Sequence, residues 1–161
     1  MMDIFRRLKS ELDNYSLNVE SMDVDRPWGG FFVIKEVHVE RFAEIYFDGL
    51  SIQDFKFSNK LSPKILIVKP FSRLSWQYHH RRAETWKIIE GPVGVKRSYD
   101  NVEGELLVYN KGDIISLKQE ERHRLIGLNN WAVVAEFWQH TDSFSPSDET
   151  DIVRLQDDYG R

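Results

Sequence analysis

Apolar residues recur at helical spacing in the first fifteen positions of the chain. The residues that fall on one face of such a helix are Ile4, Phe5, Leu8, Leu12 and Tyr15. Charged residues fill the positions between them, and the acidic Asp3 suits the start of a helix. The pattern predicts one amphipathic helix of roughly three to four turns. We expect residues 1–20 to form this N-terminal element, with its apolar stripe lying on the body of the protein or on a second subunit.

From residue 26 onward the chain consists of short apolar, β-branched and aromatic segments bounded by turn-forming residues. The predicted strands are 30–37, 42–47, 64–69, 74–79, 85–89, 93–99, 105–109, 113–117, 122–128 and 131–138. No second helical pattern interrupts them, and the polar stretch 49–63 is expected to be a long loop or a hairpin excursion. Strands at this spacing predict an all-β domain over residues 21–161, an antiparallel sandwich or barrel.

The composition narrows the classes of function. The 161 residues are 41% hydrophobic and 30% charged, which excludes disorder and a coiled coil. The chain has no cysteine, so disulfides, thiolate metal sites and thiol catalysis are excluded. A net charge of −4 argues against nucleic acid or an anionic membrane as a partner. The apolar runs are shorter than the ~20 residues of a bilayer span, and the N-terminus lacks a secretion signal, so we expect a cytoplasmic protein.

The segment before residue 80 carries the first candidate chemistry. Strand alternation places polar side chains on one face and apolar side chains on the other. The polar face holds Arg73, Ser75, Gln77 and His79, and the apolar face holds Leu74, Trp76 and Tyr78. We expect the apolar face to pack against a neighbouring layer. The polar face would then line a wet interior or a ligand cavity.

Further potential ligands follow in later strands. Glu84 comes five positions after His79, and His123 lies near the start of another predicted strand. An amide, two imidazoles and a carboxylate inside a small barrel predict a divalent metal site formed by Gln77, His79, Glu84 and His123. This mixed nitrogen and oxygen set suits Zn, Mn, Fe, Co or Ni. Either imidazole taken singly is also consistent with an ordinary surface or structural histidine.

Three separated segments of the chain resemble one known family. They are RPWG at 26–29, LSWQYHHRRAETW at 74–86 and DIVRLQDDYGR at 151–161. The middle segment is similar to the first motif of the cupin superfamily, with Gln77 in place of its first histidine, and 112–123 is similar to the second motif. Together the segments resemble the cupin domain of type II phosphomannose isomerases. The resemblance implies a cupin-type antiparallel β-barrel (a double-stranded β-helix or jelly roll) behind a short N-terminal α-helix, with a C-terminal tail closing over the barrel.

The resemblance also implies an activity. Members of this family are aldose–ketose isomerases that interconvert mannose 6-phosphate and fructose 6-phosphate through an enediol, with one divalent metal ion. Zinc is the expected ion, with Mn, Co, Ni, Fe or Mg as alternatives.

Arginines and a buried carboxylate are the expected substrate groups. Arg82 matches an arginine of the first motif, and Arg26 and Arg161 belong to the terminal motifs. With Arg73, which shares a face with Gln77, they are expected to bind the phosphate. Glu136 interrupts an otherwise apolar strand and is the candidate acid–base group, with Arg82 as the second catalytic residue. A purely structural ion pair is an equal alternative for Glu136.

Besides Gln77, and Pro92 where a threonine usually follows the glycine, four positions depart from the family's pattern. Arg81 stands where the family usually has a third histidine, and Thr85 where a histidine usually follows the glutamate. Lys118 and Glu120 replace the proline and glycine of the second motif. None of the four is a predicted ligand, so these departures bear on turnover rather than on metal binding.

Three other functions fit the same residues. One is an isomerase or epimerase acting on another sugar phosphate or on a nucleotide sugar. A metal-dependent dioxygenase is the second, although Gln77 argues against the histidine-rich iron site of such cupins. A non-catalytic, metal-containing sugar-binding cupin is the third, which the departures at Arg81 and Thr85 favour. The expected partners are a small phosphorylated sugar and a second copy of the chain in a homodimer. The remaining histidines are expected to be structural, His80, or on the surface, His38 and His140.

Overall fold

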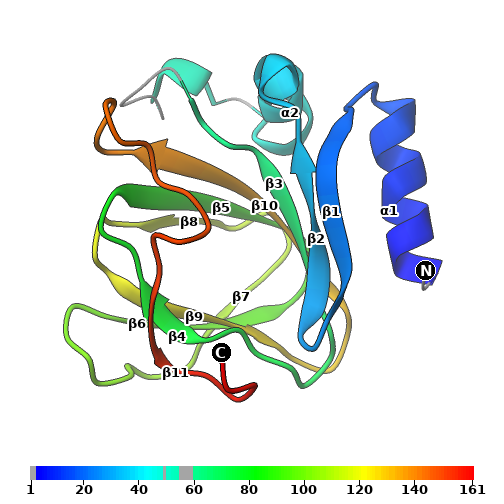
Figure 1. Cartoon of the computed structure of the whole chain (residues 1–161). Helices are drawn as coiled ribbons and strands as arrows, with labels where there is room; N and C mark the ends of the chain where they lie inside the picture. Colours follow the sequence, from blue (N-terminus) through cyan, green and yellow to red (C-terminus); the bar gives the residue numbers. More distant parts are fainter. Residues whose placement is uncertain (1–2, 49, 55–59) are drawn as a thin grey trace.

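The structure is a computed structural model that describes residues 3–48, 50–54 and 60–161. Its strands form two antiparallel sheets that lie opposite each other (Figure 1). The six-stranded sheet has the order β1-β2-β3-β10-β5-β8, and the five-stranded sheet has the order β11-β4-β9-β6-β7. The predicted all-β, cupin-type fold is confirmed.

The bounds of the elements are as follows. The larger sheet contains β1 (Val19–Arg26), β2 (Gly29–Ile34), β3 (Lys64–Val68), β5 (Arg82–Glu90), β8 (Ile114–Leu117) and β10 (Ala132–His140). The smaller sheet contains β4 (Trp76–Tyr78), β6 (Val93–Ser98), β7 (Leu107–Tyr109), β9 (Arg122–Gly127) and β11 (Val153–Gln156). The helical elements are α1 (Asp3–Asn14), α2 (Val39–Tyr46) and the short 3-10 turns η1 (Glu36–His38) and η2 (Ile52–Asp54). Within the described ranges, no helix is long and apolar enough to cross a membrane.

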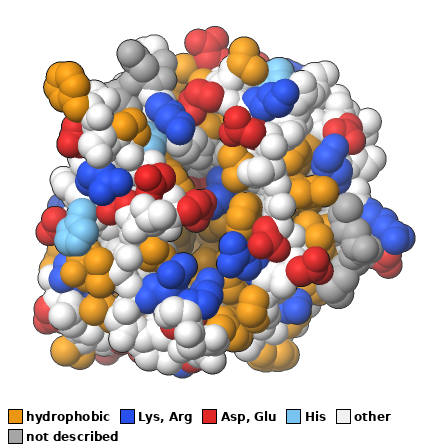
Figure 2. All heavy atoms as spheres, viewed as in Figure 1, with side chains coloured by type: hydrophobic (Ala, Val, Ile, Leu, Met, Phe, Trp, Pro, Cys, Tyr) orange, Lys and Arg blue, Asp and Glu red, His pale blue; other side chains and the backbone are white. Residues whose placement is uncertain are grey.

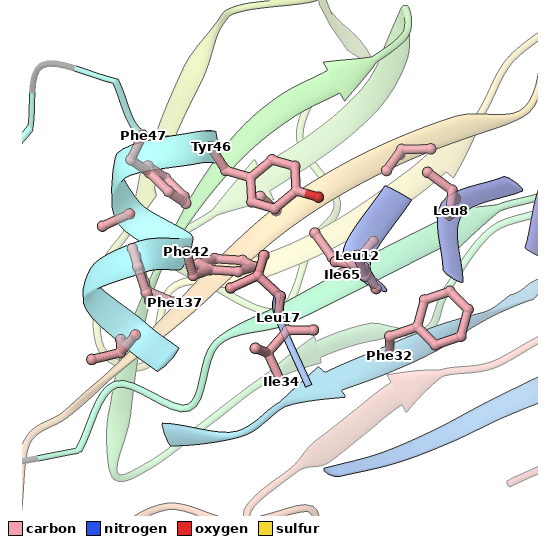
Figure 3. Close-up of a cluster of buried hydrophobic side chains, with 14 of the residues drawn as sticks. Leu8, Leu12, Leu17, Phe32, Ile34, Phe42, Tyr46, Phe47, Ile65 and Phe137 are labelled. Carbon is pink, nitrogen blue, oxygen red and sulfur yellow. The ribbon is translucent and has the colours of Figure 1, made fainter. Parts of the chain in front are cut away.

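Both α-helices pack on the outer face of the larger sheet, and the apolar side chains between them form the outer core (Figure 3). Helix α1 has the predicted amphipathic character and buries Phe5, Leu8 and Leu12. These side chains pack into the same cluster as Phe32 of β2 and Phe137 of β10. Full burial of one such side chain is worth about 1.5–3 kcal/mol, so this stripe attaches the helix firmly to the sheet.

The prediction of a strand at 42–47 is wrong, because residues 42–46 lie in helix α2 and Phe47 is its C-cap. Val39, Phe42, Ala43 and Tyr46 are the buried residues of α2, and their spacing of three, one and three is helical. The aromatic residues suggested a strand because they favour β structure, but packing on the outer core overrides that preference.

Two edge strands were not predicted, β1 and β11. Both are polar and largely exposed, so neither shows the apolar alternation that marks a half-buried strand. The β structure therefore begins at Val19 rather than at residue 26, and residue 20 lies inside β1. The predicted loop at 49–63 lies partly outside the described residues, and its described part contains η2.

The turn between β1 and β2 places Trp28 at the space between the sheets. Gly29 follows it with φ +142°, and a Cβ on Gly29 would lie 1.9 Å from the carbonyl oxygen of Ile67 on β3. Only glycine allows this close approach of β2 to β3. Trp28 is buried in a second core cluster that draws on both sheets. Next to this cluster, the space between the sheets is lined by charged side chains.

Candidate metal centre

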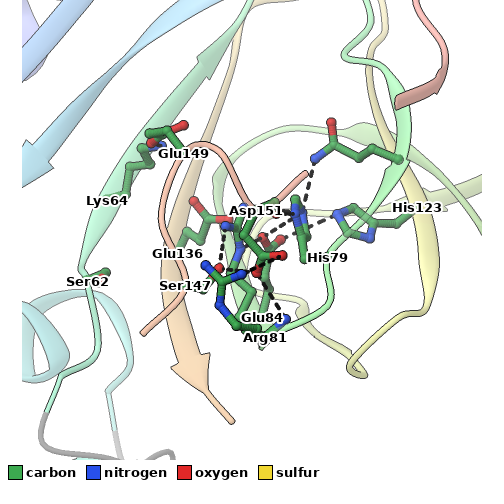
Figure 4. Close-up of polar contacts among 12 residues, drawn as sticks. Ser62, Lys64, His79, Arg81, Glu84, His123, Glu136, Ser147, Glu149 and Asp151 are labelled. Atoms are coloured by element: carbon green, nitrogen blue, oxygen red, sulfur yellow. Dashed lines mark hydrogen bonds and ion pairs between the residues drawn. The ribbon is translucent and has the colours of Figure 1, made fainter. Parts of the chain in front are cut away.

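Two histidines and a glutamate converge between the sheets (Figure 4). His79 directly follows β4, Glu84 lies on β5 and His123 lies on β9. Oε1 of Glu84 is 3.2 Å from Nε2 of His79, and Oε2 of Glu84 is 3.5 Å from Nε2 of His123. All three side chains are buried, and one ligand atom from each lies within 4.8 Å of the others. This triad is able to hold a metal ion.

Backbone carbonyls fix the orientation of both imidazoles. Nδ1 of His79 is 2.7 Å from the carbonyl oxygen of Asp151, and Nδ1 of His123 is 3.0 Å from that of Glu121. Each Nδ1–H therefore donates to a carbonyl, which leaves a lone pair on each Nε2 facing the other ligands. Nε2 of His123 is buried and has no hydrogen-bond partner among the described residues. A divalent cation is the group that satisfies such an atom beside a carboxylate.

The electrostatics favour the charge states that metal ligands need. Burial lowers the pKa of His123 to about 4, so its ring is neutral at physiological pH. Burial acts to raise the pKa of Glu84, but His79 and Arg82 outweigh it and hold that pKa well below its usual value. The centre therefore combines the neutral imidazole of His123 with the ionised carboxylate of Glu84.

Gln77 lies beside the triad. It pairs with His123 across the β4–β9 ladder, so the two side chains point to the same side of the sheet. Its Nε2 is 3.3 Å from Nε2 of His79, and its Oε1 accepts a hydrogen bond of 2.5 Å from Ser75. A half-turn of the terminal amide would exchange the positions of its nitrogen and oxygen and so turn the oxygen, the atom able to bind a metal, toward His79. The structure thus brings all four residues of the predicted metal site together.

Arg82 covers the triad from the other side. Its Nε donates to Oε1 of Glu84 at 2.9 Å, and its Nη2 lies 3.2 Å from Nε2 of His79. A third nitrogen, Nη1, donates to the hydroxyl of Ser147 at 2.9 Å. The guanidinium stacks 3.6 Å from the ring centre of Trp138. Arg82 is therefore buried and fixed directly at the site.

Glu136 lies on β10 next to the triad. Nε1 of Trp86 donates to both Glu136 and Glu84, at 3.2 and 3.1 Å. Burial raises the pKa of Glu136 to about 8, and repulsion by the Glu84 carboxylate adds to this shift. Glu136 consequently holds its proton at neutral pH while Glu84 does not, and both line the same small cavity.

The cavity beside the triad, here called the metal cavity, has a volume of about 90 Å³. Arg26, Arg154 and Arg161 line it. Figure 2 shows Lys and Arg side chains gathered beside a hollow on this face. Arg26 pairs with Asp23 and Arg161 with Asp157, each at 2.9 Å.

Arg154 is a site residue that sequence reasoning missed. It lies opposite Gln77 in the β11–β4 ladder, and directly paired residues point to the same side of a sheet. None of the ion pairs among the described residues includes it, and partial burial together with the charge of Arg161 lowers its pKa. Its place in a strand that was not predicted explains the omission.

Arg73 does not reach the metal cavity, which corrects its predicted role in phosphate binding. Strand β4 begins at Trp76, so the alternation that placed Arg73 on the face of Gln77 does not extend back to it. Its guanidinium instead binds both oxygens of Asp158, at 2.7 and 2.9 Å. Arg73 therefore attaches the C-terminal segment to the barrel.

Residues 36–157 match the profile of the family described as "Mannose-6-phosphate isomerase C-terminal". The chain belongs to this family.

Two curated relatives share part of their sequence with this chain. The chain is 25% identical over 95% of its length to a "Mannose-1-phosphate guanylyltransferase" of Salmonella montevideo. It is 33% identical over 74% of its length to the "Alginate biosynthesis protein AlgA" of Pseudomonas aeruginosa. The aligned segment makes up only 26% and 23% of these relatives. The chain thus corresponds to about a quarter of each relative.

Solved structures share the fold of this family member. The capsular polysaccharide assembling protein CapF of Staphylococcus aureus superposes with a TM-score of 0.57 at 16% identity, covering 84% of this chain and 34% of CapF. Vicilin of Corylus avellana superposes with a TM-score of 0.55 at 14% identity, covering 87% and 36%. At these identities the likeness concerns the fold alone.

The departures from the family's pattern lie outside the metal centre. The guanidinium of Arg81 donates to the carbonyl of Ser145, and the hydroxyl of Thr85 donates to Gln139 at 2.7 Å. Glu120 adopts φ +63°, the left-handed conformation that glycine takes at low cost. The turn therefore keeps the backbone shape that favours glycine although the residue has changed.

The C-terminal segment contributes contacts that the sequence did not reveal. The carboxylate of Asp151 accepts hydrogen bonds from the backbone N–H of His80 and Arg81, each at 3.0 Å, and from Ser147 at 2.6 Å. Since its carbonyl also binds His79, Asp151 holds the loop between β4 and β5 in place. Asp151 begins the third segment that resembles the family, but nothing in the sequence spacing indicates that it contacts His79.

His140 is buried, which corrects its predicted surface position. Its Nδ1 accepts a 2.9 Å hydrogen bond from the backbone N–H of Ser147, and its Nε2 lies 2.9 Å from the hydroxyl of Ser62. Its partners come from distant segments and were therefore invisible in the local sequence. His80 was expected to be structural, but it is exposed beside Glu120. His38 is partly buried, and its Nε2 has no hydrogen-bond partner within the described part of the chain.

Proposed function

We propose that this chain is a metal-dependent sugar-phosphate isomerase that interconverts mannose 6-phosphate and fructose 6-phosphate. The observation that carries the proposal is the convergence of His79, Glu84 and His123 beside a cavity lined by four arginines, Arg26, Arg82, Arg154 and Arg161. Family membership supports the choice of sugar. The reaction moves a proton between C1 and C2 of the sugar through an enediol.

Gln77, His79, Glu84 and His123 would hold one divalent ion. The bound ion would act as a Lewis acid on the carbonyl and hydroxyl oxygens at C1 and C2. Zinc suits two imidazoles with a carboxylate and an amide, and Mn, Fe, Co or Ni suit this donor set as well.

The arginines at the metal cavity would bind the phosphate. Arg154 is the most suitable of them, since no carboxylate pairs with it among the described residues. Arg26 and Arg161 bring further positive charge from two other segments of the chain. A phosphate bound here is held by charge-assisted hydrogen bonds, which are the stronger class.

Glu136 would transfer the proton. It lines the metal cavity, and the indole N–H of Trp86 orients its carboxyl group. Arg82 would place its guanidinium against the developing negative charge on the sugar oxygens. With a pKa of about 8, Glu136 is ionised in a minority of molecules at neutral pH and in more of them as the pH rises, and this ionised form is the one that removes a proton from one carbon. The proton it takes is available for return to the neighbouring carbon, so one group serves both halves of the reaction.

An assay with metal removal tests this function. The chelator-treated protein is supplied with Zn²⁺, Mn²⁺, Co²⁺ or Ni²⁺ in turn, and conversion of mannose 6-phosphate is followed through fructose 6-phosphate formation. We expect turnover that is lost on chelation and restored by a divalent ion. Metal-loaded protein that binds the sugar phosphate without converting it would contradict the isomerase proposal.

A sugar-binding cupin without turnover is the second candidate. The observation that favours it is the pairing of Arg82 with Glu84, which engages one ligand oxygen at 2.9 Å. For this candidate the same assay yields saturable binding and no product. Oxygen consumption by the iron-loaded protein would instead support the dioxygenase alternative.

A further inference from the structure

A second cavity of about 580 Å³ adjoins the metal cavity. The wall residues that line both are Phe31, Lys64, Trp138 and Glu149. The metal cavity, at about 90 Å³, is much the smaller of the two. The second cavity falls within the size range of small-molecule sites. A ligand at the metal centre and a ligand in the second cavity would lie on either side of this shared wall.

The shared wall is an ion pair between two aromatic rings. Nζ of Lys64 donates to Glu149 at 2.8 Å, and it lies 4.4 Å from the ring centre of Phe31 and 5.0 Å from that of Trp138. Figure 4 shows this pair side by side, apart from the imidazoles. Phe31 and Trp138 therefore line both the metal cavity and the second cavity.

One hydroxyl donor in the wall of the second cavity has no acceptor among the described residues. Because Nδ1 of His140 accepts from Ser147, its Nε2 carries the proton and donates to the oxygen of Ser62. The hydroxyl hydrogen of Ser62 is then free to donate elsewhere, and Ser62 lines the second cavity.

The charges of the second cavity argue against an anionic occupant. Its lining includes four carboxylates, Glu20, Glu36, Asp148 and Glu149, against two amines, Lys60 and Lys64. The remaining walls include Phe31, Val33, Ile34 and Trp138. Apolar and aromatic surface combined with acceptors and donors suits a ring that is uncharged and rich in hydroxyl groups.

We propose that the second cavity binds an uncharged glycosyl unit. The complete ligand then has two parts, a phosphorylated sugar at the metal centre and a neutral sugar ring beyond Lys64 and Glu149. The inference rests on the proposed function only for the identity of the first part. The neutral ring would lie against Phe31 and Trp138 and accept a hydrogen bond from Ser62.

Two neighbouring residues of β1 provide a matched pair of variants. Ser21 is exposed and lines the second cavity, so Ser21→Trp fills part of it. Met22 is also exposed, lines none of the cavities described above, and points to the opposite face of the strand. Met22→Trp therefore controls for the effect of a surface tryptophan on β1.

The experiment titrates methyl α-mannoside into the zinc-loaded protein by calorimetry, with and without saturating mannose 6-phosphate. We expect saturable binding under both conditions to the parent and to Met22→Trp, and at least about tenfold weaker binding to Ser21→Trp. The affinity for mannose 6-phosphate should change less than about twofold in either variant.

Three results would overturn the proposal. They are displacement of methyl α-mannoside by mannose 6-phosphate, equal affinity of the two variants for methyl α-mannoside, and absence of methyl α-mannoside binding to the parent protein. A lack of isomerase turnover would refute the proposed function alone, since these binding measurements do not depend on it.

Discussion

The two faces of the larger sheet show how one set of strands separates stability from chemistry. On β10, Phe137 points into the dry outer core, whereas its neighbour Glu136 points into the metal cavity. On β3, Ile65 belongs to the outer core and Lys64 to the cavity wall. Because side chains alternate along a strand, each strand supplies packing on one side and charged groups on the other. Substitutions at neighbouring residues of one strand should therefore change either the stability of the fold or the chemistry of the site.

Phe137→Ala should have the largest effect on stability. The side chain is fully buried, and loss of a buried phenylalanine costs about 3–5 kcal/mol. Urea unfolding of the metal-free protein measures this change. Phe144→Ala is the control, because Phe144 is fully exposed and should alter stability by less than about 0.5 kcal/mol. Equal stabilities of the two variants would refute the assignment of Phe137 to the core.

Glu136→Gln should instead abolish activity and leave the fold intact. We expect turnover to fall about 10²–10⁴-fold, the usual range for a lost acid–base group. The carboxyl pKa is raised from 4.5 to about 8, so its contribution to stability is present below pH 4.5 and is lost as the pH rises towards 8. The free energy of unfolding of the metal-free parent should therefore fall between these pH values relative to the variant. Full turnover by the variant would exclude Glu136 as the proton carrier.

Arg154→Gln should weaken sugar-phosphate binding with little change in kcat. A charge-assisted hydrogen bond is worth about 1.5–3 kcal/mol, which corresponds to a rise in KM of roughly ten- to a hundredfold. Steady-state kinetics measure this. Arg122→Gln is the control, since Arg122 stacks on Tyr78 and does not line the metal cavity. Matching KM values for the two variants would place the phosphate elsewhere.

Glu120→Gly should have the smallest effect, a stabilisation of about 1 kcal/mol. The residue holds φ +63°, which costs a residue with a Cβ more than it costs glycine. Thermal unfolding provides the measurement. Gly112→Ala is the opposite test, because Gly112 has φ +93° and alanine should destabilise the turn there. A destabilised Glu120→Gly variant would show that the side chain contributes more than the strained backbone costs.

The parts of the fold that could be predicted are those with strong apolar periodicity. Helix α1 and the central strands show it, whereas β1 and β11 are polar edge strands without it. The sequence of α2 is compatible with a helix and with a strand, because its aromatic residues favour β structure and its apolar residues also recur at helical spacing. Its packing on the outer core selects the helix.

The same division applies to the site. Gln77, His79, Glu84 and His123 could be predicted because strand parity and motif spacing are local properties of the sequence. Asp151 and Arg154 could not, since their roles depend on the C-terminal segment lying against β4. Arg73 failed for a related reason: the strand that would have oriented it begins three residues later.

Metal analysis of two adjacent histidine variants tests the central claim most directly. His79 is buried at the metal centre, and His80 beside it is exposed, so His80→Ala is a matched control for His79→Ala. Each protein is saturated with Zn²⁺, passed through a desalting column and analysed for bound metal. The convergent site predicts about one ion per chain in the parent and in His80→Ala, and less than about a tenth of that in His79→Ala. A full equivalent of zinc retained by His79→Ala would contradict the account.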